Sequence, residues 1–220
     1  SAASARSHPV GDARVGRAGV PSSRPLNRGA LQGARQGRCY APWVCGRYTL
    51  SVEPEWSELR IRVPDELLTR PRFNAGPGRP QLVVMRAPDG QLELAERPWG
   101  AHAGPRVVAN ARMESLGWPT WREHVARCVV PADGFVEWRK TEQGKEPLWF
   151  RRADRPGALL WFAGIVLPDG FVIVTTPPSA DVQAVHDRMP AILPPGRVGA
   201  WLDDEWPSAQ RLLATAPTGL

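Results

Sequence analysis

The sequence predicts a strand-dominated α+β fold in a single domain. From Cys45 on, short apolar runs alternate with proline and glycine, as in strands joined by turns. Pro168-Asp169-Gly170 is a turn of the kind that joins two antiparallel strands. With 220 residues and 42% hydrophobic composition, the chain can bury a core of its own. The predicted strands are Leu82–Met85, Leu92–Trp99, Arg127–Val130, Phe135–Trp138, Leu148–Arg151, Leu159–Val166 and Phe171–Thr175.

Helices are fewer than strands in this prediction. Pro54–Ile61 is a weak candidate, and Ser179–Val185 begins with a serine that can act as its N-cap. Pro119–Ala126 and Arg197–Asp204 complete the set. Because the strands follow one another closely along the chain, we expect mostly local, antiparallel pairing.

Composition excludes several classes of protein. No apolar run approaches the roughly 18–20 residues that span a bilayer, and the N-terminus lacks the apolar region of a secretory signal. The three cysteines, Cys39, Cys45 and Cys128, form no CxxC pair, so neither a disulfide framework nor a zinc site is expected. A reducing cytoplasm is the simplest setting for such a chain. We expect no metal and no cofactor, because no ligand cluster is visible.

The net charge of +6 is confined to the start of the chain. Residues 1–44 contain seven arginines and one aspartate, which leaves equal numbers of basic and acidic residues in the remainder. Any DNA contact made by the folded domain must therefore come from a local cluster of arginines.

Residues 1–43 are predicted to be disordered, because this Arg-, Gly-, Ser- and Pro-rich segment has no helical or strand periodicity. It could act as a basic nucleic-acid-binding arm or, less well given its prolines and glycines, as an organellar transit peptide. We favour a third interpretation, in which it is not part of the mature protein. Val44 directly precedes Cys45 and a valine codon can start translation, so the working domain would cover residues 45–220.

Five segments carry a resemblance to a known family. They are Val44-Cys45-Gly46-Arg47-Tyr48, Arg72-Phe73-Asn74-Ala75-Gly76-Pro77-Gly78, Asn110-Ala111-Arg112-Met113-Glu114, Pro131-Ala132-Asp133-Gly134-Phe135-Val136-Glu137-Trp138 and His186-Asp187-Arg188-Met189-Pro190. In this order they resemble the SRAP family, the SOS-response-associated peptidase proteins. The resemblance implies a barrel-like sheet core, and a terminal cysteine that bonds covalently to abasic sites in single-stranded DNA. The protein would then be an abasic-site sensor that shields the lesion in the DNA damage response.

The chemistry of Cys45 depends on its being N-terminal. An abasic deoxyribose opens to an aldehyde, which an amine attacks to form a Schiff base and a neighbouring thiol then closes to a thiazolidine. An α-amino group titrates near about 7.7–8.0 and a lysine near about 10.4, so the α-amine is far more often neutral at pH 7. An internal Cys45 offers only a reversible thiohemiacetal, and it could equally be an ordinary small hydrophobe at the start of a strand.

Two further residues are candidates for proton transfer. Glu137 lies in an apolar strand, where burial would raise its pKa and suit it to acid/base work, although a structural pairing with an arginine is the alternative. His186 can move protons near neutral pH, although a lone histidine is often structural. The resemblance assigns catalysis to Glu137 and a role at the deoxyribose to His186.

The remaining site residues are candidates for holding the cysteine end and the DNA. Alternation along an extended segment places Asn110 and Arg112 on one face. The resemblance implies that Asn110 orients the cysteine and that Arg112 grips a phosphate. Arg47, two residues from Cys45, and Arg188 are candidates for the same phosphate role. Asn74 either contacts DNA or satisfies its own turn.

The chain departs from the family after Trp99-Gly100, where no second tryptophan follows to act as a wedge against the base stack.

Alternative functions stay open at this point. One is a cysteine peptidase that uses Cys45 and His186, and another is a non-catalytic module that binds single-stranded nucleic acid. Lyase chemistry and self-removal of the residues before Cys45 would accompany the crosslinking function. We expect a monomer in the cytoplasm, associated with the nucleoid when bound to DNA, and no membrane partner.

Overall fold

The computed structural model describes residues 45–52, 56–67, 71–103, 106–117, 121, 126–214 and 219–220. Three predictions lie outside these residues: the disorder of residues 1–43, the start at Val44, and most of the helix Pro119–Ala126.

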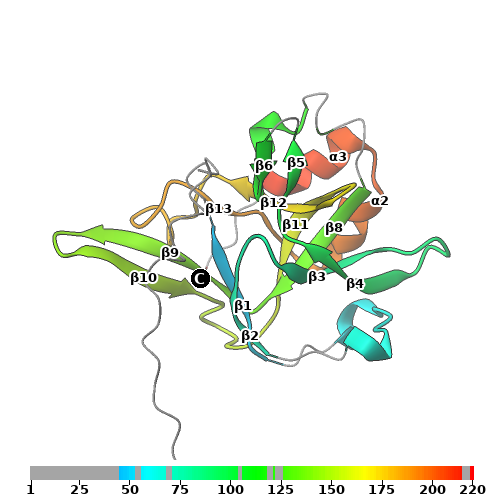
Figure 1. The fold of residues 1–220 in the computed structure, drawn as a ribbon, viewed down its shortest axis with the longest axis horizontal. Helices are drawn as coiled ribbons and strands as arrows, with labels where there is room; N and C mark the ends of the chain where they lie inside the picture. The colour runs from blue at the N-terminus through cyan, green and yellow to red at the C-terminus, as the bar shows by residue number, and fades with distance from the viewer. Residues whose placement is uncertain are drawn as a thin grey trace, which may run out of the picture. The chain divides into compact units, whose positions relative to one another are not determined.

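Two sheets form the domain (Figure 1). The smaller sheet is antiparallel and has the strand order β10-β9-β1-β2. The larger sheet has the order β13-β12-β11-β8-β3-β4, with β14 paired to β11 and β7 paired in parallel to β12. A short ribbon pairs β5 with β6. The strands are β1 (Arg47–Leu50), β2 (Arg72–Ala75), β3 (Pro80–Arg86), β4 (Leu92–Pro98), β5 (Ala101–Ala103), β6 (Arg106–Val108), β7 (Asn110–Arg112), β8 (Ala126–Ala132), β9 (Gly134–Thr141), β10 (Gly144–Phe150), β11 (Leu160–Leu167), β12 (Gly170–Thr176), β13 (Met189–Pro190) and β14 (Ile192–Leu193).

The predicted fold class is confirmed. Each of the predicted strands overlaps a strand of the structure, and Pro168-Asp169 is the turn between β11 and β12, where Leu167 pairs with Gly170. Strand pairing is antiparallel except between β7 and β12 and at two isolated bridges. Within the described residues the two sheets are open, so the sheet core is less barrel-like than the resemblance implied.

The helices of the described residues are short. The predicted helix Arg197–Asp204 is confirmed, whereas Pro54–Ile61 contributes one 3-10 turn, η1. No helix of the described part is long and apolar enough to cross a membrane. The helices are α2 (Val198–Asp203) and α3 (Trp206–Arg211), with 3-10 turns η1 (Trp56–Leu59), η2 (Asp65–Leu67), η3 (Met113–Ser115), η4 (Pro195–Arg197) and η5 (Leu212–Ala214).

The predicted helix Ser179–Val185 is wrong. This segment forms consecutive turns, in which the carbonyl oxygen of Ser179 accepts from both Val182 and Gln183. The Ser179 hydroxyl is buried without a hydrogen-bond partner and caps nothing, while the Ser179 N–H donates to the sulfur of Met189 at 3.1 Å. This bond ties the start of the segment to β13 and holds Ser179 outside a helix.

The central strands of the larger sheet are buried on both faces. All residues of β11 and β12 are buried, which explains their continuous apolar sequence. One face packs on Trp201 of α2 in the first hydrophobic cluster, which includes Val84, Val129 and Trp161. The other face packs on the smaller sheet in a second cluster that contains Cys45, Tyr48 and Phe135.

Asp133 ties the start of the domain to the junction of β8 and β9. Its buried carboxylate accepts from the backbone N–H groups of Ser51 at 2.6 Å and Val52 at 3.1 Å, and from the hydroxyls of Thr49 and Ser51. The Asp133 N–H returns a bond to the carbonyl oxygen of Thr49 at 2.9 Å. Asp133 therefore fixes the end of β1, whose first residues follow Cys45.

We expect Asp133→Ala to lower the free energy of unfolding by about 2–4 kcal/mol, because it removes several hydrogen bonds to a buried carboxylate at once. Urea unfolding measures this change. Asp154→Ala is the matched control, since the Asp154 carboxylate is exposed and, among the described residues, pairs only with Arg152, so its loss should leave the free energy of unfolding almost unchanged. Equal effects of the two substitutions would contradict the anchoring role of Asp133.

Candidate active site

Cys45 is buried between the two sheets, immediately before β1. Its exposed fraction is 0%, and it belongs to the cluster of Tyr48 and Phe135. Burial, with a smaller effect from Glu137, raises the pKa of its thiol. The backbone of Cys45 is left-handed, with φ at 51°, a conformation that costs a non-glycine residue about 1–2 kcal/mol. The sulfur is therefore a protonated thiol at neutral pH, in a constrained backbone.

Glu137 meets the backbone nitrogen of Cys45. Alternation along β9 turns Glu137 toward the core side together with Phe135, and its exposed fraction is 2%. The Cys45 N–H donates to Glu137 Oε1 at 2.7 Å. Burial raises the pKa of Glu137 to about 7; the Cys45 hydrogen bond opposes this shift and the charge of Asp187 adds to it. Both protonation states of the carboxyl group are therefore populated at neutral pH.

His186 lies on the other side of the Glu137 carboxyl group. Its Nε2 is 4.0 Å from Glu137 Oε2, and its Nδ1 accepts from the Arg188 N–H at 3.1 Å. This second contact assigns the proton of the neutral ring to Nε2, facing Glu137. Nδ1 is also 3.0 Å from the exposed carboxylate of Asp187. Nδ1 therefore lies between a backbone donor and a carboxylate.

A cavity of about 240 Å³ opens at this point, lined by Glu137, Trp138, Lys140, Lys145 and His186. The pairing of β1 with β9 stops at Arg47 and Val136, so within the described residues β9 has a free edge from Glu137 onward. This edge gives an incoming molecule access to the buried carboxyl group. The predicted residues Cys45, Glu137 and His186 are thus brought together beside one cavity.

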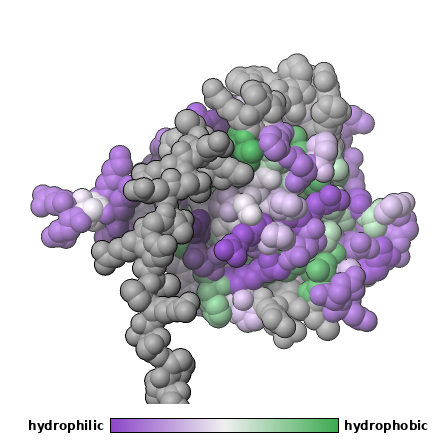
Figure 2. Space-filling view, viewed as in Figure 1, coloured by the Kyte–Doolittle hydropathy of each residue, from purple (hydrophilic) through white to green (hydrophobic). Residues whose placement is uncertain are grey.

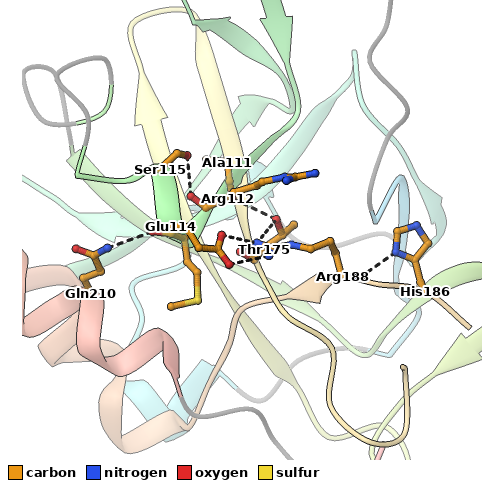
Figure 3. A network of polar contacts seen from close by, with 9 residues as sticks. Ala111, Arg112, Glu114, Ser115, Thr175, His186, Arg188 and Gln210 are labelled. Carbon is orange, nitrogen blue, oxygen red and sulfur yellow. Dashed lines mark hydrogen bonds and ion pairs between the residues drawn. The ribbon is translucent and has the colours of Figure 1, made fainter. Parts of the chain in front are cut away.

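A polar network connects the His186 segment to the end of β7 (Figure 3). The Arg188 guanidinium donates to both oxygens of Glu114 at 2.8 and 2.9 Å, and to the carbonyl oxygen of Thr175 at 2.6 Å. Glu114 and Arg188 thus form a bidentate ion pair. Since the Arg188 N–H also bonds the His186 ring, the ion pair holds the imidazole in place.

The placement of Arg188 speaks against its predicted phosphate contact. Its side chain is 9% exposed and its guanidinium is already bonded to Glu114 and Thr175. A phosphate would have to displace a bidentate carboxylate from this site. We do not carry Arg188 forward as a DNA-binding residue, because its observed contacts fix the position of His186.

Asn110 and Arg112 share one face of β7, as predicted, with Ala111 buried on the other. The Asn110 Nδ2 is buried and has no hydrogen-bond partner in the described part of the chain. The Arg112 side chain extends away from the Glu114 carboxylate and makes no hydrogen bond or ion pair with the described residues (Figure 3). Both side chains thus keep donors for a ligand.

Arg47 and Asn74 lie on neighbouring strands. The Arg47 guanidinium donates to the Gly46 carbonyl oxygen at 2.8 Å and packs on Gly76, where an added Cβ would lie 2.8 Å from Nη1. Glycine at position 76 therefore makes room for Arg47. Asn74 is exposed on β2 and lines a second, open cavity of about 460 Å³ together with Phe73 and Arg79. The pairing of Tyr48 with Ala75 brings the segment of Asn74 close to Cys45.

Sequence reasoning missed Trp138, Lys140 and Lys145, which line the cavity with Glu137. The signal for the lysines was their position on two strands joined by a tight turn. Because the residues near the turn are charged, the first predicted strand stops short of the turn and the second begins too far beyond it. No group of three or more His, Cys, Asp or Glu side chains within the described ranges is arranged to hold a metal ion.

The fold and the site together define a class of protein: an antiparallel α+β domain that holds a cysteine nitrogen, a buried carboxyl group and an imidazole beside one cavity. The chain belongs to the SOS response associated peptidase (SRAP) family, whose model matches residues 44–219.

Named relatives and solved structures agree with this membership. The chain is 28% identical over 185 residues to the abasic site processing protein YedK of Escherichia coli K12, covering 74% of this chain and 81% of YedK. It is 36% identical over 104 residues to the abasic site processing protein HMCES of Gallus gallus, covering 35% and 31%. The crystal structure of a phage-related protein from Bordetella bronchiseptica matches with a TM-score of 0.63 and 32% identity, over 79% and 90% of the two chains.

The raised pKa of Glu137 predicts a pH-dependent cost to stability. The folded-state pKa of about 7 lies above the unfolded value of about 4.5, so the folded chain binds the extra proton and loses stability as the pH rises toward 7. Glu137→Gln lacks this ionisation. We expect the free energy of unfolding of this variant, relative to that of the wild type, to rise by about 2–3 kcal/mol between pH 5 and pH 8, as measured by urea unfolding. An unchanged difference across that range would contradict the raised pKa.

Proposed function

We propose that this protein forms a covalent crosslink with abasic sites in single-stranded DNA, through the amine and the thiol of an N-terminal Cys45. The observation that carries the proposal is the 2.7 Å hydrogen bond between the Cys45 nitrogen and Glu137. In a chain that begins at Cys45, this nitrogen is the α-amine. The abasic-site processing named for the relatives agrees with such a substrate.

The first step is formation of a Schiff base. The neutral α-amine adds to the aldehyde carbon C1′ of the opened sugar, and the resulting carbinolamine loses its hydroxyl as water after receiving a proton. Glu137 suits this exchange, because a carboxyl group with a pKa of about 7 both takes the ammonium proton and returns it to the leaving hydroxyl. His186, 4.0 Å from Glu137, supplies a second proton carrier on the sugar side.

The second step closes the ring. The Cys45 sulfur adds to the imine carbon, the C=N bond becomes single, and the thiol proton passes to the nitrogen. Because burial keeps the thiol protonated, a base must accept its proton during attack, and the Glu137 carboxylate beside the nitrogen is placed for this. The overall reaction joins an aldehyde and an aminothiol as a thiazolidine and releases one water molecule.

Two side reactions follow from the same geometry. The Schiff base acidifies the sugar proton at C2′, so β-elimination with strand cleavage competes with ring closure whenever sulfur attack is slow. Self-removal of the residues before Cys45 would use Glu137 as proton donor to the leaving nitrogen. The left-handed backbone at Cys45 favours this cleavage, because an N-terminal residue has no φ to constrain.

Contacts to the strand come from side chains that keep free donors. Arg47 and Arg112 would bind phosphates on either side of the lesion, and Asn74 would lie along the strand. The buried Asn110 Nδ2 would donate to the bound sugar or to the cysteine end, which accounts for its having no partner within the described residues. A general cysteine peptidase finds no support, because the Cys45 sulfur is fully buried and its pKa is raised.

The test uses forms of the protein that begin at Cys45, incubated with single-stranded DNA bearing one abasic site and run on a denaturing gel. We expect a heat-stable shifted band from the wild-type form. The full chain has no α-amine at Cys45 and should give such a band only after the residues before Cys45 have been removed. Glu137→Gln should slow formation of the band by about 10²–10⁴-fold, the usual size of general acid–base catalysis.

Cys45→Ser separates the two steps of the reaction. It keeps the α-amine, so borohydride should trap its Schiff base as a shifted band, while the unreduced sample should show no heat-stable band. A heat-stable band from Cys45→Ser, or no band from the wild-type form, would overturn the proposal.

A further inference from the structure

Two lysines face each other across the hairpin of β9 and β10. The strands are joined by the turn Glu142-Gln143, and the register sets Lys140 directly opposite Lys145. Like charges in this cross-strand position repel and destabilise a sheet. The projecting end of the hairpin is strongly hydrophilic (Figure 2), so apolar packing does not offset the repulsion there.

The next pair of the same hairpin is arranged differently. Arg139 stands opposite Glu146, and the two side chains form an ion pair at 2.6 Å. Because side chains alternate along a strand, this neutral pair and Glu137 project from one face of β9 and Lys140 from the other. The cavity that Glu137 and Lys140 both line therefore lies at the edge of β9, where the pairing with β1 has stopped. Neither Lys140 nor Lys145 has a carboxylate partner within the described residues. One face of the hairpin is therefore neutral and the other carries two unneutralised charges.

The lysines line the cavity of about 240 Å³ that Glu137 and His186 also line. They do not set the protonation of Glu137, because burial, the Cys45 hydrogen bond and Asp187 account for the pKa of that carboxyl group. Their positive charge is thus available to a group that enters the cavity from outside. The two ammonium groups favour an anion there, because neither forms an ion pair with the described residues.

We propose that Lys140 and Lys145 form a phosphate clamp, which binds a phosphodiester of the DNA strand beside the abasic nucleotide. This inference rests on the proposed function, because it places the sugar of that nucleotide at Glu137 and His186. A bound phosphate neutralises the two facing lysines and relieves their repulsion. The clamp reads no sequence, since lysine meets a phosphate as a point charge.

The experiment measures binding to single-stranded DNA that carries a tetrahydrofuran abasic analogue, which has no aldehyde and cannot be crosslinked. Fluorescence anisotropy between about 50 and 300 mM salt gives the slope of log K against log salt. Each phosphate contact to a single strand contributes about −0.7 to this slope. Lys140→Ala and Lys145→Ala should therefore each make the slope shallower by about 0.7, and the double variant by about 1.4. All proteins begin at Cys45, and circular dichroism verifies their folding.

Arg139→Ala is the matched control, because it removes the same charge from the same hairpin, but Arg139 is already paired with Glu146 and does not line the cavity. Its slope should equal that of the wild type. An unchanged slope for the lysine variants, or an equal loss for Arg139→Ala, would overturn the clamp. Crosslinking to an aldehyde-bearing strand separates the two proposals: if the wild type crosslinks while the lysine variants keep its slope, only the clamp is wrong. A wild type that neither binds nor crosslinks would remove both.

Discussion

The hydrogen bond from the Cys45 nitrogen to the Glu137 carboxyl group is the interaction on which the site depends. A carboxyl group at 2% exposure is costly to ionise, and burial raises its pKa to about 7. An α-amine at the same nitrogen titrates near about 7.7–8.0, so the two groups have similar proton affinities. A proton can then pass between amine and carboxyl at little cost, and each step of Schiff-base formation and ring closure needs such a transfer. The same burial that makes Glu137 reactive destabilises the ionised folded chain.

The rest of the fold holds the Cys45 nitrogen and the Glu137 carboxyl group in position. β1 pairs on one side with β9, which carries Glu137, and on the other with β2, whose following turn receives Arg47 against Gly76. Asp133 fixes the end of β1. The central strands of the larger sheet, buried on both faces, provide a rigid wall behind Cys45, and the Glu114–Arg188 pair positions His186 from a different part of the chain. Four segments distant in sequence are therefore held to one cavity by backbone pairing and a few buried polar contacts.

Much of this could be read from the sequence, for identifiable reasons. Fully apolar runs such as β11 and β12 predict buried strands, and short motifs mark Cys45, Glu137 and His186 through their chemistry. The outer half of the β9–β10 hairpin was missed because its residues are charged and do not alternate with apolar ones. Backbone pairing continues there although the sequence pattern that marks a strand is absent. The contacts of Arg188 could not be read from the sequence, because burial of its guanidinium depends on Glu114 and Thr175, which are distant in sequence. The helix expected at Ser179–Val185 failed for a tertiary reason, the anchoring of Ser179 to Met189.

The most direct measurement is an NMR titration of the full chain that follows the side-chain carboxyl ¹³C of Glu137 and the amide ¹H–¹⁵N signal of Cys45. Loss of the carboxyl signal in Glu137→Gln makes its assignment. We expect the carboxyl group to titrate near pH 7, and the Cys45 amide to shift with the same midpoint in the wild type and not in Glu137→Gln. A carboxyl group that titrates near about 4.3, as an exposed glutamate does, or a Cys45 amide that does not respond, would contradict the coupling of these two groups.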